Sequence, residues 1–150
     1  MTTDAEAIAR TALRRGITVA VAESLTGGGL AQALAAAPDA SEWFAGGVVA
    51  YTVRTKARVL GVPEGPVVTA PTARQMAEGV RELLGADIAA AVTGVGGPSD
   101  EEGRPPGTVF LAIVTADSAR ITEFAFDGDP ASVVAQTIDA TLHELRVDLG

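Results

Sequence analysis

The spacing of apolar side chains at the start of the chain changes from the period of a helix to that of a buried strand. Apolar residues recur three and four positions apart over residues 5–13, with Thr3 or Asp4 available as N-cap and Gly16 as a stop. This spacing predicts a first helix. Residues 17–22 (ITVAVA) are apolar at successive positions, which is typical of a strand covered on both faces in an α/β sheet.

Strand and helix patterns alternate through the middle of the chain. The glycine-rich turn 24–29 is followed by the alanine-rich residues 30–36, which predict a helix that ends before a proline. Residues 46–51 (GGVVAY) predict a second strand, and residues 55–60 predict a helix that stops at a glycine.

The second half of the chain combines one well-marked helix with strands and a long polar loop. A threonine cap and spaced Met, Val and Leu side chains predict a helix over residues 72–84, and a strand follows over residues 88–92. The loop 93–106 contains four glycines and three prolines and is long enough to be functional. The last predicted elements are two strands that form a hairpin and a closing helix, at residues 108–115, 120–126 and 130–145.

These elements predict an α/β fold consisting of one three-layer α/β/α domain. The sheet is expected to be mixed and mostly parallel, with one antiparallel hairpin. A chain of 150 residues with 47% hydrophobic content can bury one substantial core, which agrees with a single domain.

Composition excludes several classes of function. The 11 basic and 19 acidic residues give a net charge of −8, which opposes extensive contact with a nucleic-acid backbone. No apolar run reaches about 18 residues and the chain does not open on an export signal, so we expect no membrane contact and a cytoplasmic location. The absence of cysteine excludes thiol nucleophiles, disulfides and cysteine-based zinc sites.

Two glycine-rich turns, 24–29 and 94–97, follow the carboxyl ends of two predicted strands. Open α/β sheets bind their ligands at this edge. Neither turn has the pattern of a standard nucleotide-binding loop, but their unshielded backbone amides can bind an anion or a developing oxyanion.

Ser24 lies directly after the first predicted strand, where a nucleophile would point toward such amides. Its position alone leaves two interpretations open. Ser24 is either a nucleophile or a plain turn or N-cap serine, and Thr26 competes for the capping role.

A nucleophilic serine needs a base, and few side chains can serve. His143, the only histidine, lies on the last predicted helix and is expected to be solvated. Arginine stays charged and cannot accept a proton, so Lys56, the only lysine, is the candidate base. Its ordinary pKa of about 10.4 would have to be lowered by burial or by cationic neighbours. An exposed helix lysine is the alternative.

Three further features are compatible with a site or with plain structure. Tyr51, the only tyrosine, can pass a proton or orient a substrate near Lys56, or it can fill the core. Thr93 can hydrogen-bond a substrate amide or phosphate, or it can stabilise the second turn. Residues 100–102 (DEE) indicate a solvated loop tip rather than a metal site, because three consecutive carboxylates rarely converge on one ion.

Several blocks of the sequence resemble the C-terminal domain of CinA proteins. Residues 22–28 (AESLTGG) are similar to its opening AESCTGG signature, and residues 46–51 with Lys56 and residues 60–62 (LGV) resemble its second block. The remaining similar blocks are residues 76–79, 93–98, 106–109 and 126–129. The resemblance covers nearly the whole chain, in order.

The resemblance implies an amidohydrolase domain over residues 1–150 that hydrolyses the carboxamide of nicotinamide mononucleotide to nicotinic acid mononucleotide and ammonia. It implies Ser24 as nucleophile and Lys56 as base, with Tyr51 and Thr93 in the same catalytic pocket. It also implies a pyridine nucleotide as the small-molecule partner, a homo-oligomer, and neither a metal nor a cofactor. We expect oxyanion amides within residues 26–28. The expected substrate-binding residues are Glu23, Thr26, Gly27, Gly28, Gly94, Gly96 and Gly97.

The chain departs from the family's blocks at several positions. Leu25 replaces a cysteine, and residues 52–53 (TV) replace Ser-Asn. Pro130 and Val134 stand where the family has arginines, so the grip on a substrate phosphate is expected to be weaker. Three other arginines are candidates to compensate: Arg54, Arg58 and Arg104. A catalytically silent binding domain of the same fold and an amidase of altered substrate remain the alternatives.

Overall fold

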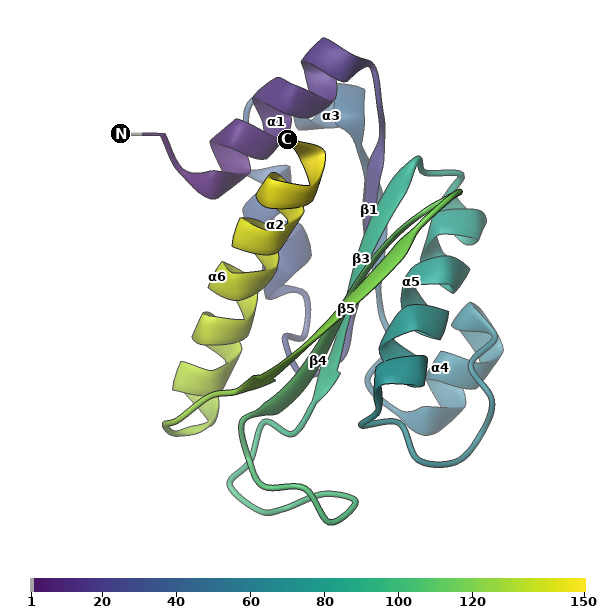
Figure 1. Ribbon diagram of the computed structural model, residues 1–150, viewed down its shortest axis with the longest axis vertical. Helices are drawn as coiled ribbons and strands as arrows, with labels where there is room; N and C mark the ends of the chain where they lie inside the picture. The colour runs from purple at the N-terminus through teal and green to yellow at the C-terminus, as the bar shows by residue number, and fades with distance from the viewer. Residues whose placement is uncertain (1) are drawn as a thin grey trace.

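The computed structural model describes residues 2–150 and has three layers, with a five-stranded sheet between two layers of helices (Figure 1). The strands are β1 (Val19–Glu23), β2 (Phe44–Val49), β3 (Ile88–Gly94), β4 (Thr108–Thr115) and β5 (Ala119–Ala125). Their order in the sheet is β2-β1-β3-β4-β5. β1 pairs in parallel with β2 and β3, whereas β4 pairs antiparallel with β3 and β5, so that β4 alone is reversed. The predicted α/β class, mostly parallel mixed sheet and antiparallel hairpin are confirmed.

Helices cover both faces of the sheet. They are α1 (Asp4–Arg15), α2 (Gly29–Ala35), α3 (Ala40–Trp43), α4 (Val53–Leu60), α5 (Ala70–Leu84) and α6 (Pro130–Leu149). Figure 1 shows α1, α2 and α6 on one face, with α4 and α5 on the other. Within residues 2–150, no helix is long and apolar enough to cross a membrane.

The central strand β1 is buried along its whole length because both its faces are covered. Val19 and Val21 join the core beneath α1, α2 and α6, whereas Ala20 and Ala22 join the core beneath α4 and α5. Side chains of a strand alternate between the two faces of a sheet, so a strand with a core on each side must be apolar at successive positions. This explains the pattern of residues 17–22.

Side-chain caps fix the N-terminal ends of α1 and α5. Thr3, rather than Asp4, caps α1, because its hydroxyl accepts from the Glu6 amide at 3.1 Å and the Glu6 carboxylate accepts from the Thr3 amide at 3.1 Å. Helix α5 begins two residues before its predicted start, because Thr69 is its N-cap and accepts from the Thr72 amide at 3.1 Å.

Some element boundaries differ from the prediction for identifiable reasons. The strand predicted at residues 46–51 is β2, which runs from Phe44 to Val49. The Ala50 amide still donates to the Glu23 carbonyl at 2.8 Å, and the chain then enters α4, whose N-cap is Thr52. Strand β3 continues to Gly94, which pairs with Val109 of β4. Helix α6 extends beyond residue 145 to Leu149, a residue buried in the core.

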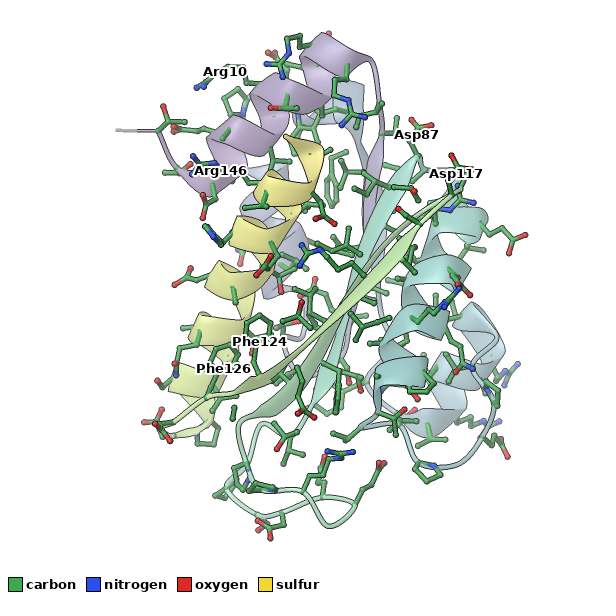
Figure 2. All side chains as sticks on the ribbon, viewed as in Figure 1. Arg10, Asp87, Asp117, Phe124, Phe126 and Arg146 are labelled. Atoms are coloured by element: carbon green, nitrogen blue, oxygen red, sulfur yellow. The ribbon has the colours of Figure 1, made fainter. Side chains whose placement is uncertain are left out.

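The two ends of the sheet carry different structures. Asp87 and Asp117 mark the end where β3 begins and where β4 turns into β5 (Figure 2). The opposite end holds the turn after β1 and the long loop after β3, at the bottom of Figure 1. The candidate site is at this second end.

Candidate active site

The carboxyl ends of β1 and β3 lie side by side because the two strands are parallel neighbours. The turn after β1 and the loop after β3 therefore meet at one edge of the sheet, around a small cavity of about 100 Å³. The cavity is lined by Ser24, Leu25, Tyr51, Gly94, Gly96, Gly97 and Glu101. A wider depression of about 300 Å³ lies between α1 and Pro38, but no serine, threonine, lysine or histidine lines it.

Ser24 and Lys56 form a buried pair at the inner end of this cavity. Lys56, on α4, is 1% exposed, and its Nζ donates to Oγ of Ser24 at 2.9 Å and to the carbonyl oxygen of Tyr51 at 3.2 Å. The candidate nucleophile and the candidate base are thus in hydrogen-bonding contact, and the alternative of an exposed lysine is wrong. The capping alternative for Ser24 is also wrong, because the N-cap of α2 is Gly28.

The surroundings of Lys56 shift the pKa of its amine. Burial lowers the pKa of the amine below its ordinary value, because desolvation disfavours the charged form. The carboxylates of Glu101 and Glu102 oppose this change, since nearby negative charge raises the pKa of an amine. Burial is the larger effect, so the neutral amine is more accessible near pH 7 than in a solvated lysine.

Glu23 is fully buried and holds the start of α2. Its Oε1 accepts from the amides of Leu30 at 2.8 Å and Gly28 at 3.3 Å, and its Oε2 accepts from the amide of Ala31 at 2.9 Å. A carboxylate is favourable at a helix N-terminus because it satisfies free amides and complements the helix dipole. These contacts favour a positioning role for Glu23, on the turn that carries Ser24, over the substrate contact expected for it.

Several amides of the turn after Ser24 are already engaged. The Gly27 amide donates to the Ser24 carbonyl at 3.1 Å, and the Gly28 amide donates to Glu23. These bonds make the two glycines less suited to the oxyanion role expected for them, and neither is among the residues that line the cavity. The amides of Leu25 and Thr26 donate to no acceptor within residues 2–150, which leaves them available for a developing oxyanion.

Two expected threonines are buried behind the cavity wall rather than lining it. The Thr93 hydroxyl donates to the Val67 carbonyl at 2.9 Å, which ties the end of β3 to the segment between α4 and α5. This engagement favours a positioning role for Thr93 over the catalytic role expected for it. The Thr26 hydroxyl is buried and has no hydrogen-bond partner in the described chain.

Tyr51 lies at the mouth of the cavity with 66% of its surface exposed. The core alternative for this residue is wrong. The Tyr51 carbonyl oxygen accepts from Nζ of Lys56 inside the protein, although the residue as a whole is exposed and lines the cavity.

The second glycine turn lines the cavity as expected, and two of its positions require glycine. A Cβ at Gly94 would lie 2.6 Å from the carbonyl oxygen of Thr108, which is too close for any side chain. Gly97 has φ of +91°, in the region that L-residues rarely adopt. A Cβ at Gly96 would have no neighbour within 4 Å, so this position borders open space.

The acidic loop tip is more closely tied to the site than the sequence predicts. Oε2 of Glu102 accepts from the Val67 amide at 2.8 Å and its Oε1 accepts from the Val68 amide at 2.9 Å. Glu101 lines the cavity beside Ser24. Both are exposed, as expected for a loop tip, but the docking was missed because its partners are backbone amides more than 30 residues away.

The structure shows what surrounds two positions that depart from the family's blocks, and one arginine that could compensate for them. Leu25 packs in the core beneath α2 and also lines the cavity. Cγ of Pro130 would lie 4.0 Å from a Cβ built on Gly97, so position 130 is beside the cavity. Arg104 stacks over Phe110, 5.0 Å from the ring centroid.

Other titratable groups lie outside this arrangement. His143 is exposed on α6, as predicted, as are Arg54 and Arg58 on α4. Within residues 2–150 no group of three or more His, Cys, Asp or Glu side chains is placed to hold a metal ion.

The comparisons with known proteins agree with this geometry. A sequence model of the CinA C-terminal domain matches residues 1–149. A relative from Desulforamulus reducens, described as competence-damage inducible, is 44% identical over 132 residues, which cover 85% of this chain and 32% of the relative. A CinA-like protein of Citrifermentans bemidjiense is 42% identical over 137 residues, which cover 87% of this chain and 33% of the relative. The chain thus spans about a third of the length of the curated relatives it matches.

A solved structure supports the same relationship. The crystal structure of a CinA superfamily protein from Klebsiella pneumoniae is 34% identical to this chain and superposes with a TM-score of 0.93. The match covers 97% of this chain and 95% of that chain. The family model matches almost the whole chain, and the first two similar blocks place Ser24 in contact with Lys56. The chain therefore belongs to the CinA family and corresponds to its C-terminal domain.

Proposed function

We propose that residues 1–150 form an amidohydrolase domain in which Ser24 is the nucleophile and Lys56 is the general base. The observation that carries the proposal is the 2.9 Å contact between Nζ of Lys56 and Oγ of Ser24. A serine hydroxyl is a weak nucleophile until a base within hydrogen-bonding distance takes its proton. The lowered pKa of the Lys56 amine supports this role, because only the neutral amine accepts a proton.

The first chemical step forms an acyl-enzyme. Lys56 takes the hydroxyl proton while Oγ of Ser24 attacks the carboxamide carbon, and the carbonyl oxygen becomes an oxyanion beside the free amides of Leu25 and Thr26. Lys56 then returns the proton to the amide nitrogen, the carbon–nitrogen bond breaks, and ammonia leaves.

The second step restores the serine. Lys56 is now neutral again. It takes a proton from a water molecule while the oxygen of that water attacks the acyl carbon. The bond to Oγ of Ser24 breaks, Oγ regains the proton from Lys56, and the product leaves as a carboxylic acid. One water is consumed and one ammonia is released for each turnover.

The substrate that we propose is nicotinamide mononucleotide, on the strength of the family's motifs. The cavity of about 100 Å³ is smaller than the roughly 300 Å³ or more of sites that enclose a drug-sized ligand. It can accept a carboxamide group, while the rest of a nucleotide lies at the mouth. Pro130 stands beside the cavity without the charge of an arginine, which favours the related possibility of an amidase with a weaker preference for phosphorylated substrates.

Ammonia release from nicotinamide mononucleotide, nicotinamide riboside and nicotinamide tests the proposal. We expect turnover in the wild-type protein and a loss of at least about a hundredfold in Ser24→Ala and Lys56→Arg. Arginine keeps the positive charge but cannot accept a proton.

Three controls accompany these variants. Ser118→Ala changes a serine in the turn between β4 and β5, at the opposite end of the sheet, and Arg58→Lys changes an exposed residue of α4. Ser118→Ala should retain activity, and so should Arg14→Lys at an exposed residue of α1, whereas Arg58→Lys should do so only if Arg58 does not bind the substrate phosphate. Turnover that survives in Lys56→Arg would assign Lys56 an electrostatic role only, and no release from any of the three compounds would favour a silent binding domain.

A further inference from the structure

The mouth of the cavity has one aromatic and one anionic group. Tyr51 is 66% exposed and lines the cavity, and Glu101 lines the same cavity. Among the cavity-lining residues of the described chain, Glu101 is the only one with a charged side chain at neutral pH. Lys56 does not line the cavity, because it is buried behind Ser24.

The backbone of Glu101 is held in place on both sides. Its amide donates to the Arg104 carbonyl at 3.1 Å and its carbonyl accepts from the Arg104 amide at 2.9 Å, which closes a tight turn. The next residue, Glu102, is bound through both carboxylate oxygens to the amides of Val67 and Val68. Its φ of +53° is one that non-glycine residues adopt only when their surroundings enforce it. Glu101 therefore stays beside the cavity rather than moving with a free loop.

The size of the cavity determines which part of a ligand meets these groups. A volume of about 100 Å³ corresponds to roughly three water molecules of the liquid. A carboxamide next to Ser24 uses most of this space, so the ring that carries the carboxamide lies at the mouth, between Tyr51 and Glu101. An aromatic face and a carboxylate are both attractive to a cation.

We propose that Glu101 and Tyr51 make the site selective for carboxamides on a positively charged ring, such as a quaternary pyridinium, over carboxamides on a neutral ring. This inference rests on the proposed function, in which the carboxamide is placed against Ser24. Glu101 is the specificity-determining residue for charge, and Tyr51 contributes its aromatic face.

A pair of small ligands isolates the charge of the ring. The N-methylnicotinamide cation and neutral nicotinamide share a carboxamide on a pyridine ring, and neither carries ribose or phosphate. Their dissociation constants are measured by NMR titration at neutral pH for the wild-type protein, Glu101→Gln and Asp100→Asn. Asp100→Asn is the matched control, because it removes the same charge from an adjacent exposed residue that does not line the cavity.

We expect the wild-type protein and Asp100→Asn to bind the cation about three- to tenfold more tightly than the neutral ligand, as for a partly exposed ion pair with an aromatic contact. In Glu101→Gln, the ratio of the dissociation constant of the neutral ligand to that of the cation should fall toward one. Equal affinity for the two ligands in the wild-type protein, no binding of either ligand, or a preference that survives in Glu101→Gln would overturn the inference.

Ammonia release from nicotinamide mononucleotide is measured on the same samples to separate this inference from the proposed function. A preference for the cation without turnover overturns the proposed function and leaves the charge selectivity of the mouth standing. Turnover without a preference for the cation overturns the charge selectivity alone.

Discussion

Burial of Lys56 has a structural cost, which the proposed role as general base would explain. A buried amine must either carry its charge without water or release its proton, and the lowered pKa of Lys56 shows that the folded protein disfavours the charge. Its hydrogen bonds to Ser24 and to the Tyr51 carbonyl offset part of this cost. Active sites often contain such locally unfavourable groups, because their reactivity depends on them.

Replacing Lys56 with an apolar residue of similar length should therefore stabilise the protein while removing activity. We expect Lys56→Met to raise the free energy of unfolding at pH 7 by roughly 1 kcal/mol, measured by chemical denaturation. The control is Arg58→Met, a change at an exposed residue of the same helix, which should stay within about 0.5 kcal/mol of the wild-type protein.

The difference in free energy of unfolding between Lys56→Met and the wild-type protein should change with pH in one direction. Below the folded-state pKa of Lys56, the wild-type protein bears the whole cost of the buried charge. As pH rises from that value to the ordinary pKa of about 10.4, the unfolded state holds more protons than the folded state, so the wild-type protein gains stability. The advantage of Lys56→Met should shrink over this range. A variant less stable than the wild-type protein at pH 7 would show that the hydrogen bonds of Nζ outweigh the burial cost.

The central pair could be predicted at the residue scale, whereas its supporting residues could not. The chain has no cysteine, one lysine, and one histidine that lies far from Ser24 in the sequence. Few side chains could therefore serve as the base for Ser24, which made Lys56 predictable. Glu23 and Glu102 bind backbone amides, which every residue except proline has, so no sequence pattern identifies their partners. The exposure of Tyr51 likewise depends on how the chain passes from β2 into α4, because Tyr51 lies outside any regular element.

At the scale of elements, the turn between β1 and α2 depends on one carboxylate. Glu23 ends β1, and its two oxygens accept three amides at the start of α2, so the strand and the helix are joined next to Ser24. Helix α2 has only seven residues and no side-chain cap at its N-cap residue, so it relies on this contact.

Glu23→Gln should destabilise the protein by about 1–3 kcal/mol, because the amide group of glutamine turns a donor toward backbone donors that then lack an acceptor. Urea unfolding measures the change. Glu6→Gln is the matched control, since Glu6 also binds the N-terminus of a helix but is exposed, and it should cost less than about 1 kcal/mol. Equal losses in the two variants would show that burial of Glu23 adds nothing to its capping role.

The elements themselves were largely predictable, and their limits were less so. Long helices and strands covered on both faces can be recognised from the local spacing of apolar residues. The observed bounds of four such elements agree closely with the predicted ones: α1, β1, α5 and β4. The four-residue helix α3 is too short to show a period and was not predicted. The ends of β2 and β3 depend on pairing with distant strands, which a local pattern does not contain.

At the scale of the whole molecule, the sheet topology assembles the site from distant segments. Ser24 and Lys56 are 32 residues apart, and the loop that carries Glu101 comes later still. Parallel pairing of β1 with β3 brings their carboxyl ends together, so the turns that follow them meet. The far ends of the chain are also joined, because Arg146 of α6 binds Asp4 of α1 at 2.8 Å (Figure 2).

Helix α6 brings a further part of the chain to the cavity. Phe124 of β5 and Phe126, which directly follows β5, stack with ring centroids 5.1 Å apart and lie toward α6 (Figure 2). The helix then begins at Pro130, beside Gly97 of the cavity wall, with Asp129 as its N-cap. A phosphate that approached this helix start would meet the Asp129 carboxylate, which already accepts the Ser132 amide at 2.8 Å.

The last prediction concerns the phosphate of the substrate and follows from this arrangement. Without an arginine at position 130, the ratio of kcat/KM for nicotinamide mononucleotide to that for nicotinamide riboside should be smaller than in family members that have one. Pro130→Arg should raise this ratio about tenfold or more, because a charge-assisted hydrogen bond contributes roughly 1.5–3 kcal/mol. Asp117→Asn makes the same change in net charge at the opposite end of the sheet and should leave the ratio unchanged (Figure 2). A strong preference for the mononucleotide in the wild-type protein would contradict the prediction and assign the phosphate to another arginine, with Arg54 and Arg58 on the exposed face of α4 as the first to replace.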